Sequence, residues 1–155
     1  MNQYTQQKFV GERALFQSRD LELSYCTFAD GESPLKESKN LKIENCLFQW
    51  KYPLWYCRNV EVKHSTMFEM ARAGIWYTDH ISMEDITYQA PKGFRRCKDV
   101  VLKDINFPNA AETLWNCSQV KMQNVTAKGD YFAMGSSDTV SYTHLRAHET
   151  TLHLV

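Results

Sequence analysis

The chain has 155 residues, of which 43% are hydrophobic, a length and composition that suit a single folded domain. Lysine plus arginine and aspartate plus glutamate number 18 each, so there is no basic field of the kind that holds nucleic acid. No stretch approaches the roughly 18 consecutive apolar residues of a membrane span. We therefore expect no nucleic-acid partner and no membrane contact.

The N-terminal segment, residues 1–13, is polar, and we expect it to cap the fold. It lacks the apolar stretch of a secretory signal peptide. The chain has five cysteines, and this odd number is typical of a reducing compartment. These features predict a cytoplasmic protein with free thiols. No paired-cysteine motif for zinc is present, and we expect neither a metal nor a cofactor.

Residues 14–138 repeat one pattern of apolar and small residues every 19 to 21 positions. The sixth and eighth residues after the opening one are aliphatic, and most of the eleventh and thirteenth are apolar. A fixed period of this length is typical of proteins built by stacking one unit on the next. Six copies begin at Leu15, Leu35, Leu54, Ile75, Phe94 and Leu114, and a seventh starts at Phe132.

The apolar spacing within each copy is two residues, which is the period of a strand and not of a helix. Turn-compatible residues such as Pro34 and Gly74 precede the opening position. The sequence therefore predicts an all-β protein, a parallel β-helix with three short strands and three corners per rung of about 20 residues and a rung separation of about 4.8 Å. A leucine-rich repeat is the alternative, because Leu41–Phe48 is similar to its core motif, although Ser, Thr or Cys replaces the preceding leucine in every copy.

Outward positions support the same register. Charges of opposite sign alternate from copy to copy, as in Glu44, Lys63 and Glu84, and we interpret them as a solvated face of the stack. A column of Asn and Asp, including Asn40 and Asn59, is expected to form a ladder of hydrogen-bonded corner side chains. Four cysteines fall on inward columns as two neighbouring pairs, and we expect buried thiols: Cys26 with Cys46, and Cys97 with Cys117.

The two positions after each opening residue should face solvent, and they carry the most distinctive side chains of the chain. Neighbouring copies place Trp-Tyr beside Trp-Tyr, followed by Arg-Arg and then Trp. Aromatic surfaces flanked by arginine suit sugar rings and their carboxylates. The sequence therefore predicts a ligand-binding surface at Trp55, Tyr56, Trp76, Tyr77, Arg95, Arg96 and Trp115. The alternative interpretation is that these rings stack on one another or lie under neighbouring loops.

Four stretches of this chain resemble a bacterial family known as domain of unknown function thirty-seven thirty-seven. They are Ala29–Ser38, Trp50–Cys57, Phe68–Thr78 and Phe107–Cys117. The resemblance covers residues 7–137, and it implies a right-handed, pectate-lyase-like β-helix in a longer protein. The family offers no accepted catalytic residues to carry over.

The repeat is lost near Asp138, and residues 139–155 resemble a translated sequencing adapter. We therefore expect a truncated chain with a non-native or disordered tail. An incomplete last rung would leave an open sheet edge, which predicts self-association through the C-terminal end.

Two functions remain open from the sequence. One is a module that binds or modifies carbohydrate, with an acidic oligosaccharide as the partner, and the other is a non-enzymatic scaffold for protein interaction or oligomerisation. The spacing gathers no three carboxylates on neighbouring rungs of one face, which favours a non-enzymatic role and leaves a polysaccharide lyase or glycoside hydrolase as the alternative.

Overall fold

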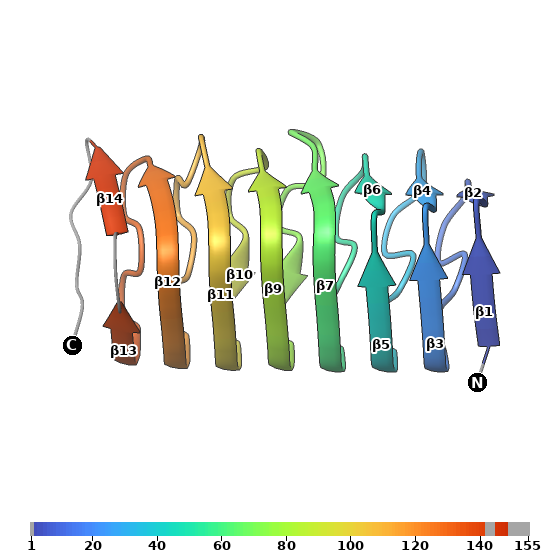
Figure 1. Ribbon diagram of the computed structural model, residues 1–155, viewed down its shortest axis with the longest axis horizontal. Helices are drawn as coiled ribbons and strands as arrows, with labels where there is room; N and C mark the ends of the chain where they lie inside the picture. The colour runs from blue at the N-terminus through green and yellow to red at the C-terminus, as the bar shows by residue number, and fades with distance from the viewer. Residues whose placement is uncertain (1, 142–144, 149–155) are drawn as a thin grey trace.

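The computed structural model describes residues 2–141 and 145–148. Within this part of the chain all regular structure is β-strand, and the strands stack side by side along a single axis with β1 at one end and β13 and β14 at the other (Figure 1). The strands are β1 (Asn2–Thr5), β2 (Lys8–Phe9), β3 (Arg19–Ser24), β4 (Thr27–Phe28), β5 (Lys39–Glu44), β6 (Leu47–Phe48), β7 (Arg58–Met67), β8 (Ile75–Trp76), β9 (Asp79–Tyr88), β10 (Phe94–Arg95), β11 (Lys98–Phe107), β12 (Ser118–Lys128), β13 (Ser137–Ser141) and β14 (Leu145–His148).

The main sheet follows the order β1-β3-β5-β7-β9-β11-β12-β13, and every pair in it is parallel. Equivalent residues of successive copies lie opposite one another, as Leu41 does to Val60 and Val60 to Ile81. All three side chains are buried. The predicted β-solenoid and its register are therefore confirmed, and the lack of a helix in the described residues argues against the leucine-rich repeat.

Each rung has more corners than the sequence indicated. In the third rung, left-handed backbone occurs at Tyr52, Tyr56, Asn59 and His64, with φ between 51° and 61°. The expectation of three corners was wrong because the opening residue lies in a short segment of its own between two left-handed positions. We call this segment the opening leg of the rung. In two copies this leg is regular enough to form strands β8 and β10.

Side-chain ladders join the corners of successive rungs. The Asn40 amide donates to Asp20 and the Asn59 amide donates to Asn40, each over 2.9 Å. Farther along the same column, the His80 ring contacts Asp99 over 2.7 Å. The expected Asn/Asp ladder is confirmed, and it suits these positions because Asn and Asp tolerate the left-handed region better than most residues.

The core is a continuous stack along the axis. Phe9, Phe28 and Phe48 stack face to face with ring centroids 5.1 and 4.9 Å apart. All five cysteines are buried and free, the two expected pairs and Cys57 as well. Burial raises the pKa of Cys46 to about 11 and that of Cys57 to about 12, so both are protonated thiols at neutral pH.

The coil continues past the position where the sequence pattern weakens. β13 runs to Ser141, and Leu145–His148 forms β14, which pairs with β12 in parallel register. The proposed boundary near residue 138 stays a prediction, and residues 149–155 lie outside the described part of the chain.

Candidate functional site

A ladder of backbone hydrogen bonds carries the predicted surface. The amide of Tyr56 donates to the carbonyl of Trp76 over 2.9 Å, and that of Tyr77 donates to the carbonyl of Arg95 over 2.8 Å. The amide of Arg96 continues the series to Trp115 over 2.8 Å. The short opening leg of each rung is thereby fixed to the next, and its side chains form columns along the solenoid axis.

The first column is made of indole rings and a guanidinium. The rings of Trp55 and Trp76 stack with centroids 5.0 Å apart and planes 5° from parallel. The Arg95 guanidinium lies 4.9 Å from the centroid of Trp76 and 5.9 Å from that of Trp115. Because the rung order places Trp55 before Trp76 and Arg95 after it, both faces of the Trp76 ring are covered.

The second column lies beside the first at the corner. Tyr56 and Tyr77 stack with centroids 4.9 Å apart, and their side chains are half exposed and 37% exposed, respectively. The Lys36 ammonium lies 5.9 Å from the centroid of Tyr56, and the exposed Arg96 occupies the rung after Tyr77. We call the seven predicted residues together with Lys36 the aromatic–cation face.

Neighbouring loops hold the indole rings in place. The Nε1–H groups donate to carbonyl oxygens of the following rung: Trp76 to Lys92 over 3.0 Å and Trp115 to Tyr131 over 2.6 Å. Trp55 donates to Ala73 in the same way, and Tyr52 packs against its ring. The tryptophans are therefore half-buried, and the expectation that they point freely into solvent is only partly correct.

The electrostatics of this face are positive. The Arg95 guanidinium contacts no carboxylate among the described residues, and its buried Nε has no acceptor. The nearby Glu112 carboxylate is paired instead with Lys92, 3.6 Å away. Aromatic rings also carry partial positive charge at their edges. Because stacking covers ring faces and leaves edges outward, the face suits anions better than the apolar faces of neutral sugars.

The structure brings all seven sequence-predicted residues together and adds two that sequence reasoning did not select. Lys36 shares the column position of the tryptophans, and that shared position is the signal that identifies it. Tyr52 stacks on Trp55 from the preceding loop with centroids 4.6 Å apart, and it falls outside the repeat positions used for prediction.

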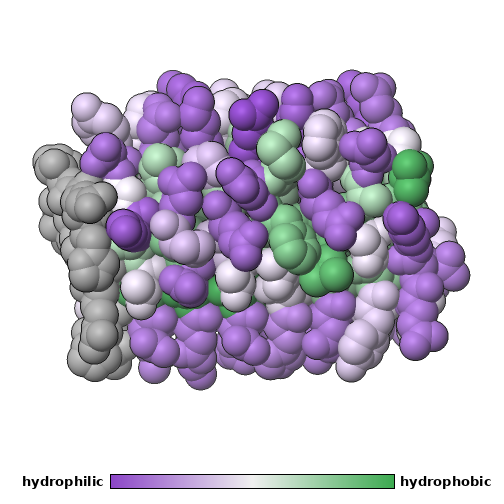
Figure 2. Space-filling view, turned by 90° about the horizontal axis from the view of Figure 1, so that it is seen from above, coloured by the Kyte–Doolittle hydropathy of each residue, from purple (hydrophilic) through white to green (hydrophobic). Residues whose placement is uncertain are grey.

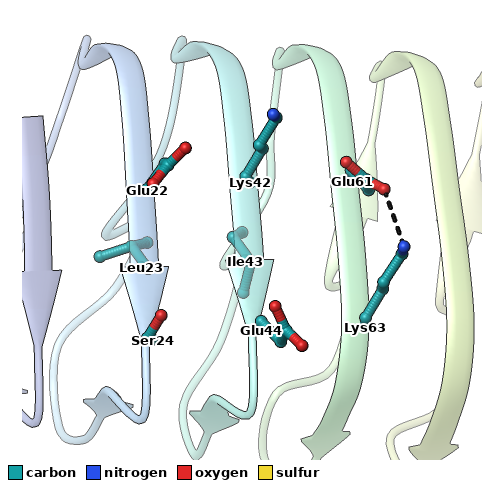
Figure 3. A pocket seen from close by; sticks show the side chains of 8 residues that line it. All are labelled: Glu22, Leu23, Ser24, Lys42, Ile43, Glu44, Glu61 and Lys63. Atoms are coloured by element: carbon teal, nitrogen blue, oxygen red, sulfur yellow. Dashed lines mark ion pairs between the residues drawn. The ribbon is translucent and has the colours of Figure 1, made fainter. Parts of the chain in front are cut away.

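A different face of the coil carries a hollow of about 300 Å³ over β3, β5 and β7 (Figure 3). Its charged lining follows the alternating columns, but Lys63 pairs with Glu61 of its own strand over 3.3 Å. A pair between rungs does form farther along, from Lys103 to Glu84 over 3.8 Å. These are solvated surface charges, and the hollow includes none of the seven predicted residues.

The surface seen from above is mainly hydrophilic, with hydrophobic side chains in small separate groups (Figure 2). Among residues 2–141 and 145–148, no three His, Cys, Asp or Glu side chains are grouped to hold a metal ion. The described part of the chain also has no helix long and apolar enough to cross a membrane.

Residues 2–150 match the family model described as "Protein of unknown function (DUF3737)". The chain belongs to this family. No curated protein matches it significantly. The family assignment thus rests on nearly the whole sequence, and it brings no activity with it.

Solved structures show what the DUF3737 chain resembles in shape. QnrB1, a plasmid-mediated fluoroquinolone resistance protein, is 10% identical and gives a TM-score of 0.50 over 96% of this chain and 93% of its own. HetL, a pentapeptide repeat protein from the cyanobacterium Nostoc, is 7% identical with a TM-score of 0.29 over 89% and 87%. A putative glycosyl hydrolase from Parabacteroides merdae is 8% identical with a TM-score of 0.25 over 93% and 78%.

The likeness to QnrB1 shows the fold alone. The pectate-lyase-like form that the family resemblance implied is not confirmed. In the second rung the left-handed corners at Asn40 and Asn45 are five residues apart, and each is followed by inward residues two apart. This part of the rung repeats with a five-residue spacing.

Proposed function

We propose that this DUF3737 chain is a non-enzymatic module whose aromatic–cation face binds an acidic carbohydrate, one that carries uronate groups. The observation that supports it is the Arg95 guanidinium, which lies between two indole rings and has no acidic partner in the described structure. An unpaired guanidinium fixed in this way is a ready receptor for a carboxylate.

Chemistry favours a carboxylate at this position. A guanidinium is planar and presents its N–H groups in a fork that matches the two oxygens of a carboxylate. The contacts of the Arg95 guanidinium with the indole rings of Trp76 and Trp115 restrict its orientation. The loss of side-chain freedom on binding is therefore small, because the structure has already ordered the group.

Catalysis is not part of the proposal. Glycoside hydrolysis needs two carboxyl groups on either side of the scissile bond. Both acids beside the face are engaged: Glu112 pairs with Lys92, and Glu37, in the column of Tyr77, accepts a hydrogen bond from the Gln17 side chain.

Binding of oligogalacturonate and of an uncharged galactose oligomer, measured by calorimetry at low salt, tests this function. Arg95→Gln should weaken oligogalacturonate binding about ten- to a hundredfold, because a hydrogen bond to a charged group contributes about 1.5–3 kcal/mol. Lys121→Gln, which removes one exposed positive charge from a different column, is the matched control. Equal affinity of both variants, or equal binding of the uncharged oligomer, would contradict the proposal.

The second candidate function is an oligomerisation scaffold. In the described residues, no strand pairs with the outer edge of β1 or of β13, so the main sheet has an open edge at each end. Open edges favour pairing with another chain. We propose self-association through the C-terminal edge, which light scattering over a range of concentrations would detect as an increase in mass. A constant monomer mass would rule out this function.

A further inference from the structure

Positive charges lie at both ends of the aromatic columns. Lys36 precedes the rings of Trp55 and Tyr56, and Arg95 and Arg96 follow the rings of Trp76 and Tyr77. The four rings between them stack without a charged side chain in either column. The face therefore has a cation at one end, two at the other, and a strip of ring edges between.

The distance between these ends is fixed by the backbone. Lys36 and Arg95 occupy the same position in copies that are three rungs apart, and the intervening corners are hydrogen-bonded to one another. At about 4.8 Å per rung, the two ends are separated by roughly 14 Å along the axis. A single sugar ring cannot reach both.

The acid that follows Lys36 in the chain is engaged by the preceding rung. The Glu37 carboxylate accepts a hydrogen bond from the Gln17 side chain of the preceding rung over 3.4 Å. The strip from Tyr56 to Arg96 is therefore free of acidic side chains in both columns, and a negatively charged chain meets no like charge there.

We propose that the ligand is a linear polyanion that lies along the solenoid axis and spans the aromatic–cation face from Lys36 to the Arg95–Arg96 pair. This inference rests on the proposed function, and it specifies the ligand as an extended uronate oligomer. Units of such a chain are similar in length to one rung, so carboxylates several units apart reach both ends at once. The ring edges of Trp76 and Tyr77 line the path between them.

The test is a length series of oligogalacturonates, from one to six units, titrated against the full chain by calorimetry. Affinity should rise about two- to fivefold once the oligomer spans both ends, because the second contact, one exposed ion pair, then forms within one complex. Lys36→Gln should weaken binding about two- to fivefold for the long oligomers and leave short ones unchanged, as expected for one solvent-exposed ion pair. Arg95→Gln should weaken binding at every length.

The outcomes separate this inference from the function on which it rests. Binding with an affinity independent of length, or an equal effect of Lys36→Gln on short and long oligomers, would overturn the axial placement and leave acidic-carbohydrate binding intact. The absence of binding at every length would overturn both. A melting curve of each variant shows whether a loss of binding is caused by unfolding. Lys36→Arg keeps the positive charge, so its affinity should depend on oligomer length as that of the unmodified protein does.

Discussion

At the scale of single residues, the most unusual group is a buried hydroxyl. The Tyr88 side chain is fully buried, its ring packs on Phe94 and Phe107, and its hydroxyl has no hydrogen-bond partner. Burial raises the pKa of Tyr88 far above its usual range, so the hydroxyl stays protonated. An unsatisfied polar atom in the core lowers the stability of the folded state, whereas burial of the apolar ring raises it.

Tyr88→Phe should stabilise the protein by about 1 kcal/mol, because it removes the unpaired hydroxyl and keeps the ring. Urea denaturation of both proteins measures the difference. Phe107→Leu serves as a contrast, since it removes ring contacts from the same cluster and should destabilise. A large loss of stability in Tyr88→Phe would show that the hydroxyl has a partner in solution.

Two glycines in the first rungs provide a matched pair. Both have positive φ, but a Cβ on Gly31 would lie 2.2 Å from the carbonyl oxygen of Gly11, whereas a Cβ on Gly11 would meet nothing within 4 Å. Gly11→Ala should lower the free energy of unfolding by about 1–2 kcal/mol, because alanine is strained at a positive φ. Gly31→Ala should cost more, because the backbone itself must move. The melting temperatures of the two variants measure this difference. Equal melting temperatures would show that the strain of the positive φ accounts for both losses and that the clash with Gly11 adds nothing.

At the scale of elements, the corners and legs of each rung were predictable to different degrees. Pairs such as Leu21 and Leu23 define a strand because their spacing alone places both inside, and the structure confirms it. The stacking of Trp55 on Trp76 agrees with the alternative interpretation that the sequence left open, because column position alone does not determine ring orientation. That orientation depends on the indole hydrogen bonds to Ala73 and Lys92, which belong to loops of irregular length.

A corner ladder gives one pH-dependent contact. The hydrogen bond of His64 to Asp85, 2.7 Å long, raises the pKa of His64 above its ordinary value of 6.5, and the nearby Glu44 and Glu84 add to the effect. The pair therefore stabilises the fold fully below about pH 6.5, the pKa in the unfolded chain, and this contribution is lost as pH rises through the higher folded pKa.

NMR titration of the His64 ring should show that raised pKa, and Asp85→Asn should return it toward 6.5. The variant should also lose the part of the pH dependence of stability that lies just above pH 6.5. An unchanged His64 titration in Asp85→Asn would show that the pair does not persist in solution.

At the scale of the whole molecule, local stability varies along the solenoid axis. Each rung contacts only its neighbours, so the free energy of opening is lowest at the ends of a stack and highest in its middle. Cys26 lies near the N-terminal end, and Cys57 lies farther inside. Both thiols are buried in the native fold and react only when their rungs open.

Alkylation in dilute denaturant, followed by mass spectrometry of peptides, should therefore label Cys26 faster than Cys57. Burial raises the pKa of Cys57 to about 12, which suppresses its reaction in the folded state. Labelling of both thiols at one common rate would indicate that the coil opens as a single cooperative unit.

The hydrogen-bonded corners also determine how this architecture can change in evolution. A duplication that inserts one complete turn between Trp55 and Trp76 would move Lys36 and Arg95 apart by one rung, with the inserted turn forming the same kinds of hydrogen bond to both neighbours. Under the proposed function, homologues that have gained or lost whole turns there would prefer ligands whose length differs in steps of one rung.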